Sequence, residues 1–240
     1  MNSLTSTLLV VLVLSGATFI RMLFGFGDAL LAMPLLALII GVPTATPLVA
    51  FVSMTTVILV LITSWQDIDI RAARHLILAS FFGIPIGLWF LKGLSEPLIT
   101  AILGVILILS SIYQLCKPVI HPPRRQEYAY LFGFIAGILG GAYNTNGPPI
   151  VIYGTLQRWT PIRFRATLQG YFFPTGIFIL VGHGVSGLWT REVLHLYVSS
   201  LPLIALAFLL GARFSHALPP RSFERAIYVF LILIGLLLIV

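Results

Sequence analysis

Four hydrogen-bonding side chains stand together between glycines and prolines in an otherwise apolar part of the sequence. Residues 140–149 read Gly-Gly-Ala-Tyr-Asn-Thr-Asn-Gly-Pro-Pro, a pattern that breaks one helix and starts another, because a missing N–H costs nothing where a helix begins. The start of that second helix presents a positive dipole end, which favours an anion. We interpret the stretch as a binding site for a small anion, with a purely structural tight turn as the alternative. Its candidate substrate-binding residues are Tyr143, Asn144, Thr145, Asn146 and Gly147.

A second break, in the first half of the chain, contains an acidic residue. Asp28 follows a Gly-Phe-Gly triplet and is flanked by apolar residues, whereas the other acidic residues lie in loops or near predicted helix ends. A carboxylate in such a setting is costly, above all inside a membrane, and is usually functional. Asp28 is therefore a candidate for proton coupling or gating, and Gly25 and Gly27 are candidates for the substrate site. Two structural alternatives stay open for Asp28: an ion pair with Arg21, or capping of the helix that starts at Ala29.

Further polar residues follow the 140–149 stretch. Gln169 lies inside an apolar run, and we expect it and Tyr171 to lie close to the substrate. The basic residues at 158–165 could attract an anion to a vestibule. The preference of basic residues for the cytoplasmic face of a membrane explains them more simply.

No motif indicates an enzyme or a bound cofactor. Cys116 is the sole cysteine, so an internal disulfide is excluded, and no Cys and His spacing typical of a metal site occurs. A nucleotide-binding loop, a Gly-x-Ser-x-Gly elbow and a His-Glu-x-x-His motif are also missing from the sequence. We predict no catalytic residue, no metal and no cofactor.

The elements that hold these residues are predicted to be membrane-spanning helices. The chain of 240 residues is 59% hydrophobic and 9% charged, and its mean hydropathy is +1.06, so it has too little charge for a water-soluble surface. The net charge of +7 could suggest a nucleic-acid partner. The basic residues instead fall in short breaks between apolar runs, which is the membrane pattern. We predict a lipid bilayer as the partner and no nucleic acid.

The apolar runs predict an all-α membrane bundle of about 8–10 hydrophobic segments, because several approach the roughly 20 residues that cross a hydrocarbon core. Two short segments follow the breaks described above, and backbone groups freed at such breaks must face protein or a cavity. The first run lacks the positive start of a signal peptide and is interpreted as a retained helix. The segments lie at 3–22, 29–41, 45–64, 75–91, 97–116, 128–142, 147–157, 166–182, 193–212 and 222–240.

The two halves of the chain resemble each other. The segment order agrees in both: long, break, short, long, long, long. Residues that recur at equal spacing are Gly25 and Pro34 with Gly140 and Pro149, and Arg71, His75 and Ser80 with Arg191, His195 and Ser200. These matches predict one polytopic domain, 1–240, built by duplication: repeat 1 at about 1–116, a linker at 117–127 and repeat 2 at about 128–240.

The distribution of basic residues predicts the orientation in the membrane. A cytoplasmic linker places all 14 Lys and Arg residues, except Lys92 and Arg191, at or near the cytoplasmic side. Each half then crosses the membrane an odd number of times, whether its broken segment crosses fully or dips in and returns. The repeats would be inverted and both termini would lie outside. Parallel repeats stay open if only one segment of each broken pair crosses.

Two stretches carry a resemblance to a known family. Residues 140–154, followed by Arg-Phe-Arg-Ala-Thr-Leu-Gln-Gly-Tyr-Phe at 163–172, resemble the second-half signature of the sulfite exporter TauE/SafE family, and residues 25–36 resemble its first-half signature. The architecture and the length match over essentially the whole chain. The resemblance implies a multi-pass protein of the prokaryotic cytoplasmic membrane that moves organosulfur compounds or sulfur oxyanions.

The expected function is secondary transport, in the export direction, of a small anion such as sulfite or an organosulfonate. Transporters built from inverted repeats bind substrate between half-helix ends near the midplane. A passive anion channel, which would conduct without saturation, and a carrier of carboxylate-type anions are the alternatives. The expected partners are the anionic substrate and the bilayer, and a homodimer is compatible with the sequence.

Overall fold

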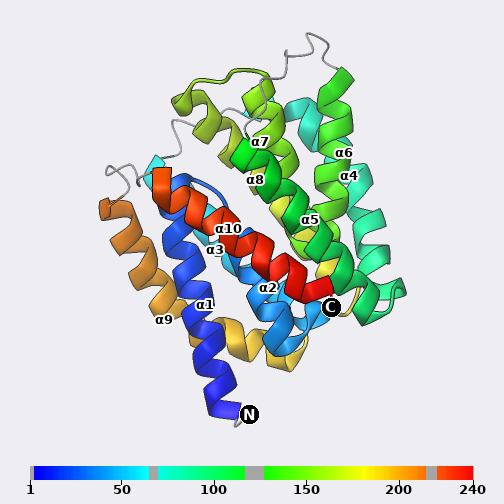
Figure 1. Ribbon diagram of the computed structural model, residues 1–240, viewed down its shortest axis with the longest axis vertical. Helices are drawn as coiled ribbons and strands as arrows, with labels where there is room; N and C mark the ends of the chain where they lie inside the picture. Colours follow the sequence, from blue (N-terminus) through cyan, green and yellow to red (C-terminus); the bar gives the residue numbers. More distant parts are fainter. Residues whose placement is uncertain (1–2, 65–69, 117–126, 215–220, 240) are drawn as a thin grey trace.

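Within the residues that the computed structural model describes, 3–64, 70–116, 127–214 and 221–239, every regular element is an α-helix (Figure 1). The predicted all-α fold is thus confirmed, with a helix for each apolar segment. The linker predicted at 117–127 lies outside the described residues except for Glu127, where α6 begins. The helices are α1 (Ser3–Phe24), α2 (Asp28–Ile40), α3 (Val42–Ser64), α4 (Ile70–Gly93), α5 (Glu96–Cys116), α6 (Glu127–Tyr143), α7 (Gly147–Leu156), α8 (Pro161–Val185), α9 (Arg191–Phe214) and α10 (Arg221–Ile239).

The length and surface of these helices fit a lipid environment. Among the described residues, five helices, α1, α3, α4, α5 and α9, are long and apolar enough to cross a membrane. Their outward faces carry large apolar side chains: Phe82 is 75% exposed and Ile62 is 72% exposed. Such extensive apolar exposure is unfavourable in water and favourable against hydrocarbon tails. The protein is therefore a membrane protein.

Two helices are too short to span a bilayer alone. α2 has 13 residues and α7 has 10, which at 1.5 Å per residue is roughly 20 Å and 15 Å, against a hydrocarbon core of about 30 Å. Each follows a three-residue break after a longer helix, as predicted. Both lie inside the bundle, with Met33 and Leu36 of α2 and Ile150 of α7 fully buried.

Helices α4 and α6 pack backbone to backbone through glycines. Gly133, Gly137 and Gly141 recur every four residues on α6, so they form one stripe along the helix. A Cβ atom at Gly137 would collide with the backbone of Ser80 on α4, and one at Gly141 would collide with the carbonyl of Ile84. Small residues at this spacing allow close approach of membrane helices. This contact holds the C-terminal end of α6, from which the second break emerges.

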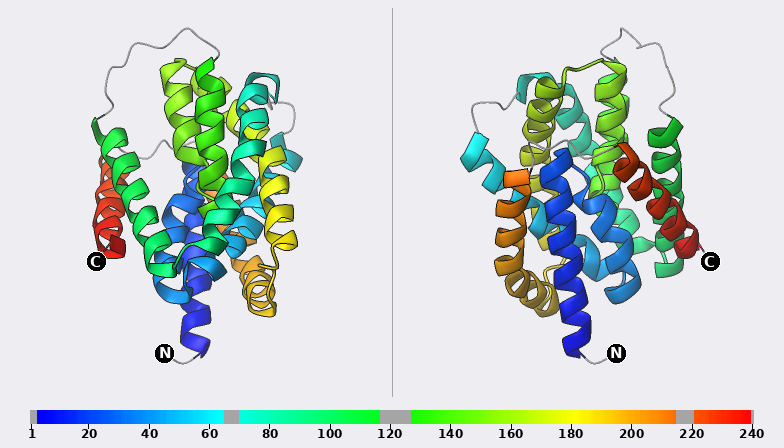
Figure 2. Two further views of the ribbon diagram at one scale, coloured as in Figure 1. Left: turned by 90° about the vertical axis from the view of Figure 1, so that its right-hand side faces the viewer. Right: turned by 60° about the vertical axis from the view of Figure 1, so that its left-hand side comes forward.

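Several helix contacts recur when each helix is replaced by its counterpart in the other half of the chain. α1 packs against α9 as α6 packs against α4, and α3 packs against α9 as α8 packs against α4. α5 packs against its counterpart α10, as both views of Figure 2 show, and α3 packs against its counterpart α8. Ser80 and Ser200, matched in the sequence, are both fully buried and donate to the carbonyl four residues earlier. The sequence correspondence between the halves thus extends to their packing.

Candidate functional site

Both helix breaks use backbone conformations that their residue types favour. Gly25 and Gly27 have φ values of 83° and 100°, and Asn144 has φ of 54°. Positive φ is strained for most residues, free for glycine and tolerated best by Asn and Asp among the others. The breaks are therefore determined locally by the sequence. They separate α1 from α2 and α6 from α7.

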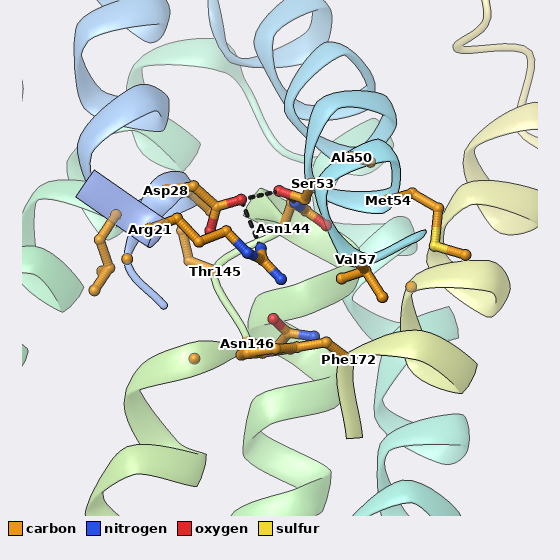
Figure 3. Close-up of a pocket in the computed structure, with 15 residues that line it drawn as sticks. Arg21, Asp28, Ala50, Ser53, Met54, Val57, Asn144, Thr145, Asn146 and Phe172 are labelled. Atoms are coloured by element: carbon orange, nitrogen blue, oxygen red, sulfur yellow. Dashed lines mark hydrogen bonds and ion pairs between the residues drawn. The ribbon is translucent and has the colours of Figure 1, made fainter. Parts of the chain in front are cut away.

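The two breaks face each other across one pocket, which also receives residues from α3 and α8 (Figure 3). The empty volume of the pocket, its mouth included, is about 470 Å³. Of the predicted site residues, the structure brings together the six that line this pocket: Gly27, Asp28, Asn144, Thr145, Asn146 and Gly147. Further lining residues are Arg21, Ala29, Leu30, Ala50, Ser53, Met54, Val57, Phe172 and Gly176.

A chain of hydrogen bonds crosses the pocket from one break to the other. Arg21 Nη1 lies 2.7 Å from Asp28 Oδ2, in a salt bridge that is almost fully buried. Ser53 Oγ on α3 donates to the same carboxylate oxygen at 2.7 Å, and Asn144 Nδ2 donates to Ser53 Oγ at 3.1 Å. The expected alternative in which Asp28 pairs with Arg21 is thus observed. The capping alternative is wrong, because the N-cap of α2 is Gly27 and Asp28 is already the first residue of the helix.

Several buried polar atoms at the pocket have no partner among the described residues. They are Nε and Nη2 of Arg21 and Oγ1 of Thr145. The guanidinium carbon of Arg21 lies 5.3 Å from the ring centroid of Phe172, so an aromatic ring covers one of its faces. Buried donors without partners are costly, and their position suits an acceptor-rich ligand.

The N-terminus of α7 offers fewer backbone donors than the sequence pattern suggested. Pro148 and Pro149 occupy its second and third positions and carry no N–H, so only Gly147 supplies one among the first three residues. At α2, the first three residues all carry an N–H, and all three line the pocket. The positive end of α2 is therefore the richer in donors.

Four predicted site residues do not line the pocket. The hydroxyl of Tyr143 donates to the carbonyl of Ile99 on α5 at 2.9 Å. The hydroxyl of Tyr171 lies 2.7 Å from Ser80 Oγ on α4. Gln169 Nε2 donates to the carbonyl of Gly25 at 3.5 Å, so this pair joins α8 to the first break.

Nine pocket residues are outside the predicted site, and three of them, Arg21, Ser53 and Phe172, carry a charge, a hydroxyl and an aromatic ring. The sequence pattern assigns Arg21 to the cytoplasmic face or to an ion pair with Asp28, whereas the structure shows that it is only 3% exposed and lines the pocket. Its position seven residues before an intramembrane carboxylate was the available signal. Ser53 is one of several hydroxyl residues in its run, with Thr55 and Thr56 just after it, and nothing in the sequence distinguishes Phe172 from its aromatic neighbours.

Two basic residues after α7, Arg158 and Arg163, do not line this pocket. Arg158 and Arg163 are both exposed, in the connection to α8 and in its first turn. Arg158 adopts a positive φ of 52° at the end of α7. Neither lines the pocket, so neither competes with Arg21 for the role of a buried cation.

Comparison with known proteins supplies the family. The model of the family described as "Sulfite exporter TauE/SafE" matches residues 8–238. A protein of Cupriavidus necator named "Probable sulfite/organosulfonate exporter TauE" is 24% identical over 228 residues, which cover 92% of this chain and 89% of that protein. No solved structure matches. A match over almost the entire chain, on helices that fit a membrane, shows that the chain belongs to the sulfite exporter TauE/SafE family of membrane transporters.

Proposed function

We propose that this protein is a secondary transporter that exports a small sulfur-containing anion, such as sulfite or an organosulfonate. Family membership supports transport, and the name of the Cupriavidus necator relative supports this substrate class. The observation that carries the proposal is the convergence of both helix breaks on one polar pocket inside an apolar bundle. Such a pocket is costly in a membrane unless it serves a solute.

The donors of the pocket fit a sulfur oxyanion. Thr145 and Asn146 present neutral hydrogen-bonding groups, and the start of α2 adds backbone N–H groups and a positive dipole. Sulfite and sulfonates are weakly basic and carry several acceptor oxygens, so neutral donors can bind them. Neutral donors also avoid holding the anion too tightly for release. Asp28, in the same pocket, is the proposed coupling or gating residue.

The transport cycle in this proposal is alternating access by two inverted repeats. The exchange of packing partners between the halves supports a two-fold relation. The view of Figure 1 supports inversion: the first residue of α1 and the last of α10 lie in its lower half, and the ends of α5 and α6 next to the linker lie in its upper half. Each half contributes one break to the pocket. Rocking of one half against the other would open the pocket to one side at a time.

The decisive experiment measures anion uptake into proteoliposomes in which the purified protein is reconstituted. We expect saturable flux and counterflow with sulfite or with small sulfonates, and weaker flux with sulfate and carboxylates. Current that rises in proportion to concentration, without counterflow, would indicate a channel. Saturable flux restricted to carboxylates would contradict the substrate class. Absence of flux for every anion of the panel would contradict the proposal as a whole.

A further inference from the structure

The guanidinium of Arg21 has one hydrogen-bonding edge that its surroundings leave unused. Nη1 pairs with Asp28, whereas Nε and Nη2 are buried and have no partner among the described residues. In arginine the Nε–H and one Nη2–H point the same way, so together they form a two-pronged donor that matches two oxygens of one anion. The unused edge is therefore suited to bidentate binding.

The neighbours of Arg21 restrict how a ligand can reach it. Phe172 lies over one face of the guanidinium, and Asp28 occupies the Nη1 end. Figure 3 shows the guanidinium between the Asp28 carboxylate and the side chains of Asn146 and Phe172. An anion held by the free edge would thus lie close to the neutral donors of the second break. Residues from both halves would contact it at once.

The charge balance of the pocket gives Asp28 a defined part in binding. Arg21 and Asp28 are the charged residues that line the pocket in the described part of the chain, and their charges cancel. A singly charged anion on the free edge brings the total to minus one. The carboxylate then repels the ligand through a medium of low dielectric, while the guanidinium attracts both. Asp28 and the anion therefore share one cation.

We propose that Arg21 is the anion-binding residue of this transporter, that its Nε–Nη2 edge holds two oxygens of a sulfonate or sulfite, and that Asp28 limits the affinity by sharing the guanidinium. The inference rests on the proposed function and adds to it the residue that selects for an oxyanion. It assigns the main binding role to α1 and the start of α2. The Asn144–Asn146 stretch completes the shell of donors.

The test uses full-length protein in detergent and isothermal titration with methanesulfonate and with sulfite. Arg21→Lys keeps the charge but loses the two-pronged donor, so affinity for the anion should fall about tenfold or more. The double variant Arg21→Gln with Asp28→Asn keeps the pocket neutral, which protects folding, and should lose binding. Asp28→Asn alone removes the competing charge and should bind roughly tenfold more tightly. Arg74→Gln, at the exposed start of α4, is the matched control and should bind like the wild type.

Each result decides between the two proposals. Wild-type affinity in a folded double variant, or unchanged or weaker binding in folded Asp28→Asn, overturns the inference. If either of these variants fails to fold, Arg21→Lys decides, and equal affinity to the wild type overturns it. If every Arg21 variant transports substrate at the wild-type rate, that result contradicts this inference alone. Failure of the wild type to bind or carry any oxyanion contradicts the proposed function.

Discussion

At the scale of single residues, the pocket is organised by the buried pair of Arg21 and Asp28. Burial of two charges costs several kcal/mol of desolvation each, which a single hydrogen bond between them offsets only in part. Here the carboxylate also accepts from Ser53, but two guanidinium nitrogens have no partner. A pair serving packing alone would be replaceable by apolar residues. The half-satisfied pair fits a role in binding and coupling.

Asp28→Asn should separate coupling from substrate binding. Asn keeps the size of Asp and its hydrogen bonding to Ser53, but it cannot release or take up a proton. We expect proton-driven accumulation to be lost in proteoliposomes, while exchange of labelled substrate across a membrane without a proton gradient persists. Glu192→Gln, at an exposed acidic residue, is the control. Normal proton-driven accumulation by a well-folded Asp28→Asn protein would remove the coupling role.

Asn146→Ala should weaken substrate binding without unfolding the protein. Loss of one donor to a charged ligand costs on the order of 1.5–3 kcal/mol, so the apparent Km should rise tenfold or more. The measurement is initial uptake rate against sulfite concentration, with thermal unfolding as the check on folding. A triple variant of Asn144, Thr145 and Asn146 to alanine with unchanged kinetics would exclude the second break from the site.

At the scale of elements, the position of the second break depends on the glycine contact between α4 and α6. This contact brings the two backbones together along much of both helices. The break at 144–146 follows directly from the end of α6. Widening the contact would therefore shift Asn144 and Asn146 relative to the first break, so helix packing and site geometry are linked.

Gly137→Ala should destabilise the protein, whereas Gly16→Ala should not. A Cβ at Gly137 meets the backbone of Ser80, while a Cβ at Gly16 meets nothing within 4 Å. Both glycines lie inside helices, so both substitutions gain about 0.8–1 kcal/mol of helix propensity. Overpacking against backbone should reverse that gain at Gly137, with a cost of roughly 1–3 kcal/mol. Thermal unfolding in detergent measures the difference, and equal unfolding temperatures would show that α4 and α6 separate without cost.

At the scale of the whole molecule, basic residues lie near both ends of the long helices α4 and α9. Arg74 lies in the first turns of α4 and Lys92 next to its last residue, and α9 begins at Arg191 and ends near Arg213. Lys92 Nζ donates to the carbonyl of Ser186, which precedes α9, so Lys92 and Arg191 lie at one end of the bundle. These are the two basic residues that the charge pattern assigns to the outside.

Topology can be measured by cysteine labelling in a background without the exposed Cys116. We expect an impermeant thiol reagent to label cysteine at position 2 or 92 in intact cells, and at position 74 only after lysis. The physical reason is the preference of basic residues for the cytoplasmic side. Labelling at position 2 only after lysis would contradict the inverted arrangement. A cysteine at position 124, in the linker, provides an independent check: it should be labelled only after lysis if the linker is cytoplasmic.

The sequence by itself determined the membrane-spanning helices, the two breaks and the order of long and short segments, which agrees in both halves. These features follow from local properties: apolar length sets which segments cross the bilayer, and glycine, asparagine and proline set where the backbone turns. The pairing of Asp28 with Arg21 was also within reach, because only a short break separates them in the chain.

Only the tertiary structure decided which side chains line the pocket. Neighbouring residues on a helix differ by about 100° in direction, so Phe172 faces the pocket while Tyr171 bonds to Ser80 on α4. In a soluble helix the polar face would reveal the orientation, but a helix between lipid and an apolar core is apolar all round. Arg21 and Ser53 could therefore be placed at the substrate pocket only once the packing of α1 and α3 against the two breaks was known.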